Sequence, residues 1–375
     1  MAVFNTSKRY YLNGIDWVMA ALDRLNIKQT GLGNHSQLVL VLQGYLDKTK
    51  LAQRIAFVLS KNMFFKGSTR RAWHLAPYWA PEQHDFNPKD IRFFNLDPDH
   101  RVMDDSSMDD GSINKNLDQV LQDCAKTTFK DDKTLLGFDL IHCNNRSYLI
   151  MRFTHRMFDA RGAERLLEYI LDEKSSFRQY GLPSQSAQLN AWKSRFLSGQ
   201  SINRFLRSIY SKKLNVAKAI NTNGNDDTKK ISNKARFNEK YTKDKHPCFH
   251  CSTFSRDQTD TIDDNAIKKA GYLMNGIFIL SCVAKSFNSL FKQHKCLGDM
   301  LIPINVDLRE TKFGTAKIFF NNVSFMLFKV EQNLSTANYI KSLKTQFIDQ
   351  VKNKIPHHFI NASLLMRIMP LKILS

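Results

Sequence analysis

A histidine and an aspartate stand where the sequence changes from a strand pattern to a helix pattern. His155 and Asp159 follow a mostly apolar run at 147–154, and residues 164–171 after them carry apolar side chains at helical spacing. An imidazole titrates near neutral pH and can take a proton from an alcohol or an amine. A lone histidine at a strand end is more often a packed structural residue, so the role of His155 depends on its surroundings.

The length and the order of elements predict a mixed α/β protein with two comparable lobes. A chain of 375 residues with 42% hydrophobic residues can bury two cores. We expect an N-terminal lobe at 1–185, a basic helix and polar linker at 186–245, and a C-terminal lobe at 246–375. The polar composition of residues 221–245, rich in Asn, Lys and Asp, is typical of a connector.

Apolar periodicity predicts the main elements of both lobes. The predicted strands cover residues 37–42, 135–140, 148–153, 249–254, 301–306 and 322–330, and the predicted helices lie within 9–28, 51–59, 116–129, 261–270 and 276–291. Residues 73–100 contain four prolines, which predict an irregular stretch without regular elements.

The net charge of +20 permits partners that carry phosphates or carboxylates: coenzyme A, an acidic carrier protein, anionic lipid or nucleic acid. No zinc-finger spacing or RNA-binding signature accompanies the charge. The first eleven residues lack an apolar signal core, no apolar run approaches about 18 residues, and six scattered cysteines suggest no disulfide framework. These features predict a cytoplasmic protein.

Two segments allow more than one interpretation. A broken apolar stripe from Trp192 to Ile209 is surrounded by Lys and Arg, so it predicts either a helix packed on its own protein or a basic segment resting on anionic lipid at the inner face of the membrane. Packing is the default for such stripes. The stretch 246–251 contains two histidines and two cysteines, but alternation along a strand directs them to opposite faces, so we expect no metal site.

Several stretches, in the same order, resemble the coenzyme A-dependent acyltransferase superfamily. This superfamily includes peptide-synthetase condensation domains, wax ester synthase-like acyltransferases and chloramphenicol acetyltransferase. Thr154, His155 and Asp159 match its His-His-x-x-x-Asp-Gly motif in all but the first His and the Gly. The further matches lie at residues 16–25, 38–46, 73–79, 270–275, 303–309 (Pro-Ile-Asn-Val-Asp-Leu-Arg) and 321–325 (Asn-Asn-Val-Ser-Phe).

The resemblance implies a bilobed α/β fold of two chloramphenicol acetyltransferase-like lobes with a channel at their interface. It also implies acyl transfer from a thioester, either acyl-coenzyme A or a phosphopantetheine-linked acyl group on a carrier protein, to a hydroxyl or amine acceptor. His155 would be the general base, and the reaction would need no bound cofactor or metal and no acyl-enzyme.

The resemblance also assigns roles to other residues. Asp159 would face away from His155 and pair with an arginine, for which Arg309 is the candidate; Arg152 and Arg161 are rivals. Asn322, and after it Ser324, are the candidates for an oxyanion donor or substrate contact, with ordinary polar strand residues as the alternative. Asn275 is expected to cap or position a helix.

The sequence departs from the superfamily pattern in ways that keep alternatives open. Ala160 replaces the Gly after the aspartate, with Gly162 displaced by two positions, and the chain ends at Ser375, earlier than its relatives. A catalytically inactive relative that binds a carrier protein or an acyl chain is therefore the main alternative. A basic protein that binds nucleic acid or the membrane periphery is supported by charge alone.

Overall fold

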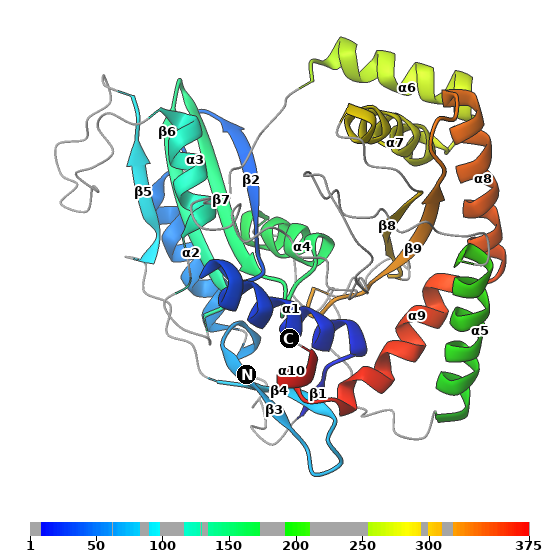
Figure 1. Cartoon of the computed structure of the whole chain (residues 1–375). Coiled ribbons are helices and arrows are strands. Elements are labelled where there is room, and N and C mark those ends of the chain that lie inside the picture. Colours follow the sequence, from blue (N-terminus) through cyan, green and yellow to red (C-terminus); the bar gives the residue numbers. More distant parts are fainter. Residues whose placement is uncertain are drawn as a thin grey trace, which may run out of the picture. The chain divides into compact units, whose positions relative to one another are not determined.

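A computed structural model describes most of the chain (Figure 1): residues 9–61, 63–82, 90–97, 116–127, 129, 134–172, 192–210, 254–293, 299–309 and 318–374. The chain forms two compact units. The first comprises Met1–Arg195, Asp307–Val323 and Ile360–Ser375, and the second comprises Phe196–Val306 and Ser324–Phe359. The predicted boundaries after residues 185 and 245 lie outside the described residues, so the three-part division stays a prediction.

A four-stranded sheet organises the first unit. Its order is β2 (His35–Gln43), β7 (Arg146–Thr154), β6 (Leu136–Cys143) and β5 (Arg92–Asn95); β7 pairs antiparallel with both neighbours, and β5 is parallel to β6. The strands β6 and β7 form a hairpin whose turn holds two asparagines, Asn144 and Asn145, at positive φ. The predicted strands at 135–140 and 148–153 are confirmed.

Helices cover both faces of this sheet (Figure 1). Leu149 and Met151 of β7 belong to the main core with α2 (Lys48–Ser60) and α4 (Ala160–Leu171), whereas Ile150 packs with α3 (Leu117–Lys126) on the other face. A central strand buried on both sides reads as a continuous apolar run. That burial explains why the sequence before His155 does not alternate.

The prediction of an irregular stretch at 73–100 is wrong. A second sheet, in the order β1 (Tyr10–Tyr11), β4 (Pro77–Pro81) and β3 (Gly67–Arg71), occupies part of it, and β5 follows. Pro77 and Pro81 stand at the two ends of β4, where a missing N–H costs little. The prolines therefore mark the limits of a strand and do not prevent it.

Distant segments of the chain complete the first unit. The helix α1 (Gly14–Thr30) contacts the C-terminal elements η6 (Leu364–Ile368) and α10 (Leu371–Leu374). The three residues Ile318, Phe319 and Phe320 are buried in the main core. Phe320 forms a parallel bridge with Phe158, and its amide donates to the carbonyl of Met157. The segment 318–322 is thereby fixed beside the turn that carries His155.

The second unit consists of helices and a two-stranded sheet. Its elements are α5 (Trp192–Tyr210), α6 (Arg256–Ala270), α7 (Asn275–Gln293), β8 (Met300–Asp307), β9 (Val323–Val330), α8 (Thr336–Lys352) and α9 (Ile355–Ser363). The first residues of α5, the last residues of α9 and the terminal residues Asp307 of β8 and Val323 of β9 belong to the first unit. Alternate residues of β9 pack on α7 and α8 in a separate core. Two glutamines of α8, Gln346 and Gln350, hydrogen-bond the backbone of Lys329 and Leu327 along the edge of β9.

Among the described helices none is by itself long and apolar enough to cross a membrane; α6 and α7 meet the length and composition test only as a pair, bent by 95°. The helix α5 buries Ile209 but leaves Phe196 67% exposed. Contact of α5 with anionic lipid stays a prediction. The stretch 246–251 and most of the predicted strand at 249–254 lie outside the described residues.

Candidate functional site

His155 lies in the turn between β7 and α4. Its backbone N–H donates to the carbonyl of Asn34, 3.1 Å away, and the next residue, Arg156, forms an ion pair of 3.2 Å with the buried Asp23. Asp23 in turn accepts from the N–H of Asn34 at 2.6 Å. The turn is therefore fixed to the residues that follow α1 as well as to the two elements that it joins.

The His155 imidazole is suited to accept a proton. Burial of the ring lowers its pKa below 6.5, although the Asp159 carboxylate, the Phe158 carbonyl and the Asn321 side chain act in the opposite direction. The net result is a neutral ring at neutral pH. A neutral, half-buried imidazole can act as a general base without first losing a proton to solvent.

The carboxylate of Asp159 is 2% exposed and holds together three parts of the first unit. Its Oδ1 accepts from the backbone N–H of Gly162 at 2.8 Å, and so caps α4, and from the guanidinium of Arg309 at 2.5 Å. Its Oδ2 accepts from the backbone N–H of Asn322 at 2.8 Å. Both oxygens are thus engaged by groups other than His155, and Asp159 acts as a structural tie.

The structure distinguishes the three arginines that the sequence offered as partners of Asp159. Arg309 makes the contact with Asp159, whereas Arg152 pairs with the buried Asp139 at 2.9 Å and Arg161 pairs with Glu164 at 2.7 Å on the surface of α4.

The displaced glycine of the motif has a simple structural basis. Ala160 is the first residue of α4 and does not have a positive φ, so this position does not require glycine. Gly162 does require it, because a Cβ at this position would lie 2.2 Å from the carbonyl oxygen of Ile318. The glycine displaced by two positions permits the close approach of the segment that contains Asn321 and Asn322.

Asn321 and Asp16 are site residues that the sequence analysis missed. Asn321 is fully buried, and its side-chain Nδ2 donates to the backbone carbonyl of His155 at 2.9 Å and to Asp16 Oδ1 at 3.0 Å. Asp16 closes a capping box with Asn13 at the start of α1. The pattern Asn-x-x-Asp before a helix was a readable signal for Asp16. The resemblance placed Asn322, and not Asn321, at the position of the superfamily's asparagine.

The predicted oxyanion donors lie in different environments. The Asn322 side-chain Nδ2 donates to the carbonyl of Phe320 at 3.1 Å, within the first unit. Ser324 belongs to the second unit, is 1% exposed, and its hydroxyl donates to the carbonyl of Pro356 at 2.7 Å. Asn275 starts α7 and donates to Asp263 of α6. The catalytic roles of Asn322 and Ser324 stay predictions.

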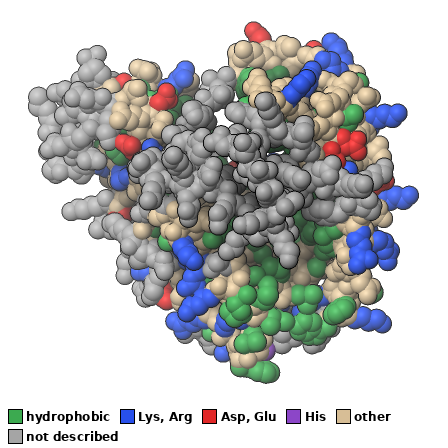
Figure 2. Space-filling view, in the orientation of Figure 1, with side chains coloured by type: hydrophobic (Ala, Val, Ile, Leu, Met, Phe, Trp, Pro, Cys, Tyr) green, Lys and Arg blue, Asp and Glu red, His purple; other side chains and the backbone are tan. Residues whose placement is uncertain are grey.

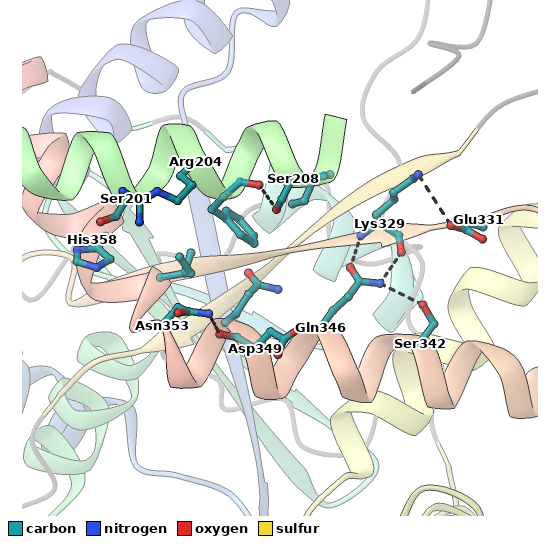
Figure 3. A pocket seen from close by; sticks show the side chains of 14 residues that line it. Ser201, Arg204, Ser208, Lys329, Glu331, Ser342, Gln346, Asp349, Asn353 and His358 are labelled. Atoms are coloured by element: carbon teal, nitrogen blue, oxygen red, sulfur yellow. Dashed lines mark hydrogen bonds and ion pairs between the residues drawn. The ribbon is translucent and has the colours of Figure 1, made fainter. Parts of the chain in front are cut away.

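The second unit contains a cavity of about 740 Å³ between α5, β9, α8 and α9 (Figure 3). It mixes cationic, anionic and apolar side chains, and Gln346 and Gln350 in its wall are occupied by the backbone of β9. A serine and a histidine, Ser198 and His358, lie 3.1 Å apart at this cavity. Ser198 is only 3% exposed and does not line the cavity, so the pair is a poor nucleophile for a ligand there.

The described surface is basic. Figure 2 shows Lys and Arg side chains in many places on the visible face and Asp and Glu side chains in few, as the net charge of +20 implies. Such a surface attracts phosphates and carboxylates.

Comparisons with solved structures identify the fold. The first condensation domain of the calcium-dependent antibiotic synthetase is similar with a TM-score of 0.60 at 11% identity, over 93% of this chain and 76% of that chain. The condensation domain of the monacolin K polyketide synthase MokA gives 0.53 at 8% identity, over 97% and 77%. The protein SgcC5 from Streptomyces globisporus gives 0.53 at 11% identity, over 96% and 76%.

No family model and no curated protein matches the chain by sequence. The chain has the fold of condensation domains. This finding confirms the predicted α/β fold and its resemblance to those domains.

The first testable consequence concerns the ion pair between Asp159 and Arg309. Arg309→Met should lower the free energy of unfolding of the first unit by about 3–5 kcal/mol, because it leaves the buried Asp159 carboxylate without its counter-charge. Asp159→Asn should cost less, because Arg309 keeps its ion pair of 2.9 Å with Asp307. The double variant should cost less than the sum of the two. All four tryptophans belong to the first unit, so urea unfolding followed by tryptophan fluorescence measures this unit.

The exposed pair of Arg161 and Glu164 is the matched control, and its removal should cost less than about 1 kcal/mol. Strict additivity of the Asp159 and Arg309 variants would contradict the contact.

A second consequence concerns Asp16, whose burial raises its pKa from 3.8 to about 7. Between these two values the unfolded chain releases the proton and the folded chain keeps it, so wild-type stability should fall as the pH rises. Asp16→Asn removes this loss. Its stability relative to the wild type should therefore increase from about pH 4 to about pH 7 and then level off. Urea unfolding at several pH values measures the difference.

Asp47→Asn, which removes an exposed cap carboxylate from α2, controls for the loss of a charge. A difference between Asp16→Asn and wild type that does not change with pH would show that the Asp16 carboxyl is not desolvated.

Proposed function

We propose that the protein transfers an acyl group from a thioester to a hydroxyl or amine acceptor, with His155 as the general base. The donor is acyl-coenzyme A or an acyl group on the phosphopantetheine arm of a carrier protein. The observation that carries the proposal is the His155 turn: a half-buried imidazole with a lowered pKa, held by a turn whose aspartate is fully engaged elsewhere.

The reaction needs no group beyond the two substrates and the imidazole. His155 takes the proton of the acceptor as its oxygen or nitrogen attacks the thioester carbonyl. The carbon–sulfur bond then breaks, and the imidazolium returns the proton to the departing thiolate. No acyl-enzyme forms, because the acceptor and not the protein is the nucleophile.

Negative charge develops on the thioester carbonyl oxygen during the attack, and a hydrogen-bond donor would stabilise it. Asn322 is our candidate, because an amide nitrogen carries two hydrogens and only one is used by the bond to Phe320. The Ser324 hydroxyl has a single hydrogen, which Pro356 accepts, so Ser324 is the second choice.

The nature of the donor is supported by charge and by fold. The neighbours in fold include condensation domains of an antibiotic synthetase and of a polyketide synthase. The basic surface would suit the phosphates of coenzyme A or the acidic face of a carrier protein. Nucleic acid and anionic lipid are other polyanions that this charge attracts, and neither has a part in the proposed reaction.

The main alternative, an inactive relative that binds a carrier protein or an acyl chain, is weakened by the geometry of the turn. One of its two arguments was Ala160 in place of glycine. Ala160 has ordinary helical backbone, and Gly162 supplies the close approach to the 318–322 segment. The substitution therefore does not disturb the position of His155.

His155→Ala should reduce turnover by about 10²–10⁴-fold, the usual contribution of a general base. The measurement is thiol release from a panel of short to long acyl-coenzyme A thioesters with a pooled acceptor extract, repeated with carrier-bound donors. Equal release by wild type and variant, or none with any donor while both proteins are folded, would reject acyl transfer by His155.

A further inference from the structure

Asn321 forms hydrogen bonds with the N-terminus of α1 as well as with His155. Besides the two bonds of its Nδ2, its backbone N–H donates to Asp16 Oδ1 at 2.7 Å, and its carbonyl accepts from the side chain of Asn13 at 2.7 Å. Asp16 Oδ2 accepts from the N–H of Asn13, also at 2.7 Å. Asn13 and Asp16 at the N-terminus of α1 thus make three hydrogen bonds with Asn321.

These contacts fix which way the Asn321 amide points. The NH2 group and the oxygen of a side-chain amide have nearly the same shape, so their positions are assigned from the hydrogen bonds around them. The groups on one side are the Asp16 carboxylate and the His155 carbonyl, which are both acceptors, so the NH2 must face them. The amide oxygen Oδ1 is left to face another direction.

Two buried atoms at the site lack a hydrogen-bond partner among the described residues: Oδ1 of Asn321 and Nδ1 of His155. One is an acceptor and the other can carry a proton. Burial lowers the pKa of the His155 ring, and three groups favour its protonated form: the Asp159 carboxylate, the Phe158 carbonyl and the Asn321 side chain. Of these, the Asn321 side chain is the one that also holds the His155 backbone. Hydrogen bonds of catalytic groups are often long before substrate binds and tighten in the working complex.

We propose that Asn321 and Asp16 are positioning residues for His155: Asp16 fixes the Asn321 amide, and that amide holds both the backbone carbonyl and the Nδ1–H of His155. The proposal rests on the proposed function, in which Nε2 is then the basic nitrogen. Each atom has a defined role. Nδ2 fixes the main chain of the turn, and Oδ1 fixes the tautomer and the plane of the ring.

The two hydrogen bonds between Asn321 and Asp16 do not require a charged Asp16 carboxylate. Both bonds from Asn321 end on Oδ1, which remains an acceptor when a proton resides on Oδ2. Other groups that face Asp16, namely Asn13 and the more distant Asp159 and Arg367, affect its proton and not this contact.

The test compares Asn321→Ala and Asp16→Asn with Asn322→Ala, in which the neighbouring asparagine loses a side chain that donates to Phe320. Asn322→Ala is a control for the NMR readouts alone, because Asn322 is also the candidate oxyanion donor. The ring of His155 is followed by nitrogen-15 NMR of histidine-labelled protein, with the signal assigned from its loss in His155→Gln. In wild type the ring should be protonated at Nδ1 when neutral.

In Asn321→Ala the pKa of His155 should fall and the Nδ1–H tautomer should lose population, while Asn322→Ala leaves both unchanged. Asp16→Asn should change them in the same direction but less, because an amide at this position still offers one oxygen. The thiol-release kcat of Asn321→Ala should fall by on the order of 10²-fold with little change in KM, as expected for a displaced catalytic group.

The NMR result does not require activity, so it separates this proposal from the proposed function. If the wild type releases no thiol, the proposed acyl transfer is rejected, but the positioning role of Asn321 is not. If Asn321→Ala does not fold, Asp16→Asn carries the same test. A folded Asn321→Ala or Asp16→Asn variant with the wild-type tautomer, pKa and kcat would overturn the positioning role.

Discussion

A carboxylate that is buried must be paired, and the pairing of Asp159 determines the arrangement of the first unit around His155. Asp159 caps α4, accepts the backbone of Asn322, and neutralises Arg309 at 2.5 Å. Residues 150 positions apart in the chain are thereby joined at the turn after β7. Without the Asp159 carboxylate, Arg309 would lose this ion pair and the backbone N–H of Asn322 would lose its acceptor beside the His155 turn.

The His-x-x-x-Asp spacing suggests that Asp159 could be the relay partner of His155. The hydrogen bonds of Asp159 give it a structural role instead. The Asp159 carboxylate accepts three hydrogen bonds from groups other than the His155 ring. In the proposed function His155 is therefore a base without a charged relay partner. In the positioning role proposed for Asn321, the ring is oriented by the buried amide that also donates to the His155 backbone carbonyl. The N-terminal capping box of α1 therefore has a part in the site as well as in the helix.

Local pattern predicted much of the fold, and long-range contacts decided the rest. The apolar run before His155 and the helical spacing after it correctly gave β7 and α4, because burial on both faces leaves a clear signal. The prolines of 73–100 misled, since a proline at a strand end looks the same in sequence as one that breaks a strand. Sequence could not tell which of the adjacent Asn321 and Asn322 faces His155, because that depends on the bridge between Phe158 and Phe320.

The central claim is that a neutral His155, with a pKa lowered by burial, removes the proton of the acceptor. The pH dependence of kcat/KM for acyl transfer tests it most directly. The account predicts a rate that falls on acidification with an apparent pKa below 6.5, and a residual rate of His155→Ala that lacks this limb. The same acid limb in both proteins, or a rate already lost above pH 7, would contradict His155 as the base.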